Sequence, residues 1–82
     1  MDTLIAMRSF VRVVETGSFS AVAKEENTTQ ATISKRVAAL EASLETQLLI
    51  RGSRVHQLTE SGQSYYERVT HILREVEEAE AR

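Results

Sequence analysis

The segment from residue 28 to residue 35 carries side chains suited to hydrogen bonding rather than to covalent chemistry. The amide of Gln30 donates and accepts at once, which matches adenine N6 and N7, and Lys35 can reach guanine O6 and N7 or a phosphate. Hydroxyls in the same segment suit phosphate oxygens near a helix N-terminus, where free N–H groups and the helix dipole favour anions. They belong to Thr28, Thr29, Thr32 and Ser34. These residue types predict a surface that binds duplex DNA.

Two helices joined by a tight turn are expected to position this segment. Ser18 can cap a short helix that ends near Glu26, residues 27–29 form the turn, and Thr29 caps the following helix. The inward residues of the first helix are Phe19, Val22 and Ala23, and the buried stripe of the second is Ile33, Val37, Leu40 and Leu44. The opposite, small and polar face is then Gln30, Ala31, Ser34, Lys35 and Ala38. This arrangement predicts a helix-turn-helix whose second helix fits the major groove.

Further elements are expected on both sides of this motif. An apolar face predicts a first helix that runs to about Glu15 and stops at Gly17. Its residues are Leu4, Met7, Phe10, Val11 and Val14. Residues 48–51 and 55–58 read as two short strands around a Gly52-Ser53 turn, which predicts a two-stranded wing.

Two arginines flank the turn of the expected wing. Arg51 and Arg54 would reach phosphates or a narrow minor groove, although pairing with Glu residues across the hairpin remains an alternative. Thr29, likewise, has a capping role that outweighs any contact it adds with DNA.

The region after residue 58 has the periodicity of a coiled coil. Thr59 is expected to cap a helix that continues to the end of the sequence. Apolar residues then recur at spacings of four, three, four and three, which favours a seam against a second copy. The seam consists of Tyr65, Val69, Ile72, Val76 and Ala79, with Tyr66 and Leu73 widening it. We therefore expect a homodimer in which residues 1–58 form the winged helix-turn-helix and residues 59–82 the linker and dimerisation helix.

The composition bounds these expectations. Eighty-two residues can build one small, mainly α domain, namely a three-helix core with a short β wing and a long C-terminal helix. The net charge of −2 argues against a nucleic-acid partner, but residues 27–58 hold four basic against two acidic side chains, whereas residues 59–82 hold three against six. The lack of cysteine and of any long apolar run suits a soluble, cytoplasmic protein with no membrane partner.

Other functions find less support in the sequence. His71 stands one helical turn from Glu67 and from Glu75, but no further metal ligand is evident, and no nucleophile has an obvious base. We therefore expect no enzyme activity, metal or cofactor. The competing hypothesis is a protein-interaction module in which the last helix is the functional surface. The acidic net charge favours that hypothesis, and the face from Gln30 to Lys35 opposes it.

Over its whole length the sequence resembles the LysR-type transcriptional regulators. The matching positions are Phe10, Val14, Gly17-Ser18-Phe19, Ala23, Thr29-Gln30, Ile33-Ser34-Lys35, Val37, Leu40-Glu41, Leu44, Leu48, Arg51, Leu58-Thr59 and Gly62. The resemblance implies a bacterial repressor or activator in which linker helices pair two subunits, each inserting a recognition helix into half of an interrupted dyad. It also implies a larger effector-binding domain that drives higher oligomers and is absent from these residues.

Several positions depart from the pattern of this family. Glu26 and Thr28 stand where apolar residues are usual, Val22 replaces alanine, Glu45 replaces a common glycine, and Leu49 replaces a frequent phenylalanine. The wing segment Val55-His56-Gln57 is also less basic than usual. We expect different local packing around the helix-turn-helix and a smaller contribution of the wing to DNA affinity.

Overall fold

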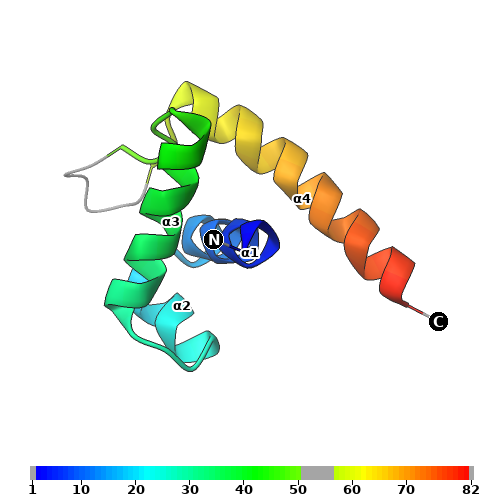
Figure 1. Ribbon diagram of the computed structural model, residues 1–82, viewed down its shortest axis with the longest axis horizontal. Helices are drawn as coiled ribbons and strands as arrows, with labels where there is room; N and C mark the ends of the chain where they lie inside the picture. Colours follow the sequence, from blue (N-terminus) through cyan, green and yellow to red (C-terminus); the bar gives the residue numbers. More distant parts are fainter. Residues whose placement is uncertain (1, 51–56, 82) are drawn as a thin grey trace.

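The computed structural model describes residues 2–50 and 57–81, and this part of the chain folds into four helices (Figure 1). They are α1 (Thr3–Thr16), α2 (Phe19–Glu25), α3 (Gln30–Leu44) and α4 (Glu60–Glu80). The expected mainly helical fold is confirmed. None of these helices combines the length and hydropathy needed to cross a membrane, as far as the described residues go.

The helices begin and end at residues that the sequence identifies. The backbone N–H groups of Ala21, Thr32 and Gly62 donate to the side-chain oxygens of Ser18, Thr29 and Thr59, over 2.9 to 3.1 Å. Gly17 ends α1 in the left-handed conformation, with φ of 70°. Because these signals are local, the element boundaries follow from the sequence.

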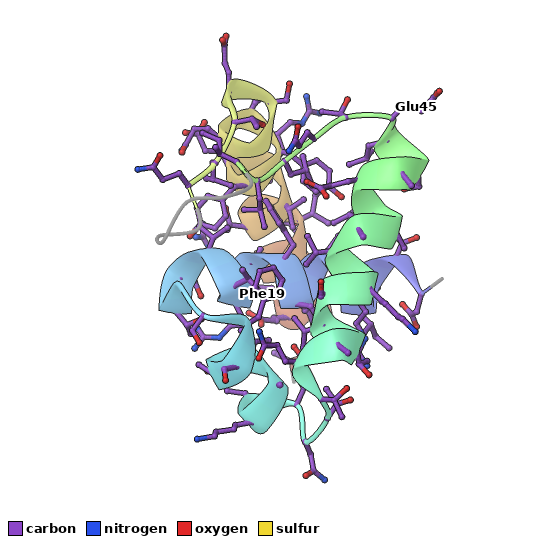
Figure 2. All side chains as sticks on the ribbon, turned by 90° about the vertical axis from the view of Figure 1, so that its left-hand side faces the viewer. Phe19 and Glu45 are labelled. Atoms are coloured by element: carbon purple, nitrogen blue, oxygen red, sulfur yellow. The ribbon has the colours of Figure 1, made fainter. Side chains whose placement is uncertain are left out.

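Helix α1 lies at the centre of the fold. Figure 1 views it nearly end-on, with α2 and α3 on one side and α4 on the other. Phe10 and Val13 are completely buried, and Figure 2 shows Phe19 in the middle of the molecule. Leu4, which was expected on the buried face, is 38% exposed. That expectation was wrong because Leu4 lies in the first turn of α1, at the edge of the packing. Further along, α1 has neighbours on more than one side, so its buried face is wider than a single stripe.

Helix α3 buries most of its predicted stripe. Ile33, Val37 and Leu40 are buried, but Leu44 is 40% exposed, so its predicted burial was wrong. Leu44 is the last residue of α3, and the chain turns away directly after it. The turn passes through Glu45, which adopts a left-handed conformation with φ of 52° and lies at the outer end of α3 in Figure 2. A residue with a Cβ thus occupies a position that favours glycine.

The segment after α3 is fixed to the helix by a carboxylate. Glu41 Oε2 accepts hydrogen bonds from the backbone N–H groups of Leu48, at 2.7 Å, and Leu49, at 3.1 Å. Both leucines are buried and belong to the core, from which Leu44 is absent. Leu49 forms an antiparallel bridge with Leu58, and within the described residues no longer strand is found. The expected turn of the wing lies outside the described residues.

Helix α4 packs on the core through its part up to Leu73. Phe10 contacts Tyr65 and Tyr66, with ring centroids 5.7 and 6.5 Å apart, and Val69 and Leu73 are buried. From Arg74 onward no described residue of α4 is buried, and the helix runs away from the other helices in Figure 1. The five predicted seam residues therefore do not share one environment: Val69 belongs to the chain's own core, and Ile72 is 40% exposed.

Gly62 allows α4 to start against the segment that follows α3. A Cβ atom at position 62 would lie 2.0 Å from the carbonyl oxygen of Leu48, far inside van der Waals contact. The same oxygen accepts a hydrogen bond from the backbone N–H of Thr59, so it cannot move away without breaking the N-terminal end of α4. The close approach requires glycine.

Gly62→Ala should therefore lower the free energy of unfolding by about 3 kcal/mol, because one methyl group must displace backbone rather than a side chain. Urea denaturation measures the loss. The control is Ser61→Ala at the adjacent, exposed position, which should change stability by less than about 0.5 kcal/mol. Equal stabilities of the two variants would contradict the close approach.

Candidate nucleic-acid interface

The outer face of α3 is small, polar and open to solvent. All five residues predicted for this face are exposed: Gln30, Ala31, Ser34, Lys35 and Ala38. On the opposite side Ile33 and Val37 are completely buried, so the orientation of the helix is fixed by its apolar stripe. The predicted exposure is confirmed. Short side chains beside Gln30 and Lys35 let another molecule approach the helix backbone closely.

Threonine hydroxyls surround the N-terminus of α3. Thr29 Oγ1 accepts from the backbone N–H of Thr32 at 3.1 Å and lies 2.9 Å from Thr32 Oγ1. Thr29 is exposed and Thr32 half-buried. Thr28 is half-buried, and its backbone N–H donates to the carbonyl of Ala23 at 2.9 Å, which closes the turn. The capping role of Thr29 is confirmed, whereas contacts of these hydroxyls with phosphate remain predictions.

The turn between α2 and α3 is held by a polar cluster that the sequence analysis missed. Ser9 Oγ donates to both carboxylate oxygens of Glu26, at 3.0 and 3.1 Å, and Arg36 Nη1 forms an ion pair with Glu26 Oε1. Arg36 Nη1 also lies 3.4 Å from Ser9 Oγ. We call Ser9, Glu26 and Arg36 the clasp. It joins α1, the turn and α3, and its available signal was Glu26, a carboxylate at a position where the family resemblance implies an apolar residue.

A second set of ion pairs joins α1 to α2. Arg12 binds both carboxylate oxygens of Glu25, with Nε 2.9 Å from Oε1 and Nη2 2.7 Å from Oε2, and also contacts Glu15 at 2.6 Å. The hydrogen bonds to Arg12 lower the pKa of Glu25 below its ordinary value of 4.5. The same bonds raise the pKa of Arg12, which stays charged at every physiological pH. Both helices that position α3 are therefore braced by arginine.

Not all of the residues predicted to contact DNA lie in the part of the chain that the structure describes. Arg51 and Arg54 lie outside the described residues. A groove of about 430 Å³ runs beside the outer face of α3 and is lined by Thr32, Lys35, Arg36, Ala39, Asp2 and Ile5. Within the described ranges no three His, Asp or Glu side chains are placed to hold a metal ion. The geometry offers hydrogen-bond donors and acceptors, one cation and hydroxyls on an exposed helix face.

Solved structures with the same arrangement contain DNA-binding domains. The chain is similar to the crystal structure of a BenM_DBD/catB site 1 DNA complex, with a TM-score of 0.89 and 36% identity over 93% of this chain and 82% of that one. It is also similar to a CbnR_DBD–DNA complex, with a TM-score of 0.85 and 32% identity over 93% and 87% of the two chains. The fold and the exposed face of α3 thus define a helix-turn-helix DNA-binding domain of a transcription regulator.

Proteins of similar sequence identify the family within this class of DNA-binding domains. The model of the bacterial regulatory helix-turn-helix proteins of the lysR family matches residues 4–63, and the chain belongs to this family. An HTH-type transcriptional regulator of Haemophilus influenzae is 43% identical over 99% of the chain. The HTH-type transcriptional activator AaeR of Escherichia coli is 40% identical over 95%. The resemblance to LysR-type regulators and the expectation that the chain is not an enzyme are confirmed.

The chain corresponds to only one part of these proteins. It spans 28% of the length of the Haemophilus influenzae regulator and 25% of AaeR. Both activators and repressors are similar to this chain. AaeR is an activator, and a transcriptional repressor of Pseudomonas aeruginosa is 40% identical over 99% of the chain. Similarity over this domain therefore does not indicate whether the regulator activates or represses transcription.

The pair Arg12–Glu25 should make stability depend on pH in the acid range. Because the folded pKa of Glu25 lies below its ordinary value, the pair stabilises the folded state above about pH 4.5, and this contribution is lost as the pH falls through the folded pKa. In Glu25→Gln the free energy of unfolding should fall less steeply on acidification. The difference should be small because both side chains are exposed to solvent.

Urea denaturation at a series of pH values from about 6 to 2.5 measures this effect. Arg12→Met should remove the same part of the pH dependence, and Glu25→Gln should then add nothing in the Arg12→Met background. If the free energy of unfolding of Glu25→Gln falls as steeply on acidification as that of the unmodified chain, the pair does not stabilise the fold.

Proposed function

We propose that this chain binds an interrupted dyad in duplex DNA as a homodimer, each copy placing α3 in one major groove. The observation that carries the proposal is the small, polar and exposed outer face of α3, fixed opposite a buried stripe and formed by Gln30, Ala31, Ser34, Lys35 and Ala38. The similarity to domains solved in complex with DNA supports it. The bacterial cytoplasm, where the chromosome lies, is the compartment that this function requires.

The exposed residues divide by chemistry. Gln30, Ser34 and Lys35 read base edges, because amide, hydroxyl and ammonium groups match the donors and acceptors of the major groove. Thr28, Thr29 and Thr32 position the helix on phosphates, and Ala31 leaves room for the backbone to approach. Arg51 and Arg54 anchor a two-stranded wing on the DNA backbone. The antiparallel bridge between Leu49 and Leu58 supports a hairpin at this place.

Dimerisation uses the part of α4 that the core leaves uncovered. Ile72 is 40% exposed, Val76 is half-buried, and Ala79 is exposed one turn further along. Tyr65 is half-buried on Phe10 and borders this stripe, whereas Val69 stabilises the fold of each copy. Residues 1–58 thus form the DNA-binding unit and residues 59–82 the linker helix. In the full-length protein a further domain would bind the effector and drive higher oligomers.

Gln30→Ala should reduce discrimination between sites by about 1–3 kcal/mol, because it removes one bidentate contact with a base. The target is obtained by selecting bound duplexes from a random pool with the unmodified chain. Affinity for that duplex should fall while affinity for a random duplex stays unchanged. Gln63→Ala, the same substitution on the exposed surface of α4, should leave both affinities as they are. Equal losses on both duplexes for Gln30→Ala would remove it from the base-reading set.

Ile72→Glu should weaken dimerisation by about 2 kcal/mol, since it buries a charge in the proposed interface, without unfolding the core. Sedimentation velocity over a concentration series measures the dissociation constant. Gln63→Glu adds the same charge nine residues earlier, half a turn around the helix, and should leave the dimer intact. A dimer of unchanged affinity in Ile72→Glu would place the interface elsewhere. A dimer that selects no duplex at all would favour a protein-interaction module.

A further inference from the structure

Helix α3 carries two adjacent cations whose surroundings differ. Lys35 is exposed on the outer face and makes no ion pair with any residue that the structure describes. Arg36, its neighbour in sequence, is paired with Glu26 and has a side chain only 30% exposed. The face that α3 presents outward therefore carries one free cation instead of two.

The clasp holds the guanidinium of Arg36 on the side of α3 that packs against α1. Glu26 is kept in place by Ser9, which is completely buried and donates to both of its carboxylate oxygens. Because Ser9 belongs to α1 and Glu26 to the turn, the contact with Ser9 holds the carboxylate independently of Arg36. The carboxylate side chain is only 25% exposed, so leaving it unpaired would be costly, which favours the paired state.

Arg36 nevertheless stands at the edge of the proposed DNA-binding surface. It lines the groove of about 430 Å³ together with Thr32 and Lys35. It also lines a second groove, of about 450 Å³, with Glu26 and Arg8 on the side of α1. An arginine side chain is long enough to swing from one groove to the other once its carboxylate is removed.

We propose that Glu26 is a positioning residue that withholds Arg36 from the DNA backbone and so keeps affinity for DNA of any sequence low. An arginine released beside Lys35 would bind phosphate, which strengthens binding to every sequence alike and carries no information about the bases. Holding it in the clasp keeps non-specific affinity low and leaves discrimination to Gln30, Ser34 and Lys35. This inference rests on the proposed function, since it presupposes that α3 faces DNA.

Glu26→Gln tests the inference through the salt dependence of binding. Dissociation constants are measured between about 50 and 200 mM salt on the selected duplex and on a random duplex of equal length. One added phosphate contact should steepen the slope of log K on log salt by about 0.9 on both duplexes. Affinity for both duplexes should rise by a similar factor at the lowest salt, so the ratio of the two affinities should stay the same. A merely structural role of Glu26 would lower affinity without steepening the slope.

Two controls isolate the clasp. Glu25→Gln removes the same charge one residue earlier, where Arg12 keeps its contact with Glu15, and should retain the slope of the unmodified chain. The double variant Glu26→Gln with Arg36→Gln should return to that slope, because the released cation is gone. A steepened slope in Glu25→Gln, or one that persists in the double variant, would overturn the inference.

Folding of the variants is checked by thermal melting. If Glu26→Gln is unfolded at the assay temperature, Glu26→Leu replaces it, since leucine cannot pair with Arg36, and the same slopes are expected. An unchanged slope in a folded Glu26 variant would overturn the proposed role of Glu26 and leave the proposed function standing. Absence of salt-dependent binding by the unmodified chain would instead refute the proposed function.

Discussion

Burial of α1 is the constraint on which the rest of the structure depends. Phe10 is completely buried, with α2 and α3 on one side of its helix and the two tyrosines of α4 on the other. Because α1 has neighbours on both sides, each of these neighbours must bring an apolar face to it. The orientation of α3 follows directly: once Ile33 and Val37 face α1, the residues from Gln30 to Ala38 on the other side must face outward.

Ion pairs at the rim of this core explain how a chain of negative net charge can bind DNA. Among its acidic residues, Glu15 and Glu25 are bound to Arg12, and Glu26 is bound to Arg36. The two arginines offset most of the charge of these three carboxylates within the α1, α2 and α3 unit. The formal charge of −2 is therefore a poor guide to the field at α3, where Lys35 is exposed. The two pairs of Arg12, which are the more exposed ones, add little stability, so their main effect is on position and charge.

The features that could be predicted from the sequence are local. Caps such as Ser18 and Thr29 act over three residues, and the helical period assigns Ile33 and Gln30 to opposite faces without knowledge of the neighbours. The errors arose where distant segments meet. Leu44 has the right period for burial, but it is the last residue of α3 and the chain turns away directly after it. The clasp joins residues up to 27 positions apart, and no pattern along the chain could pair Ser9 with Arg36.

Helix α4 shows why a single apolar stripe can serve two interfaces. Val69 packs within the chain, while Ile72, three residues later, is exposed on an adjoining face, and a heptad pattern cannot separate the two. Because both faces belong to one continuous helix, a partner bound at Ile72 is held at a fixed orientation to the core that Val69 stabilises. In the proposed dimer no flexible linker lies between the interface and α3. The spacing of the two recognition helices, and hence of the DNA half-sites, would then be set by the packing of α4 on Phe10.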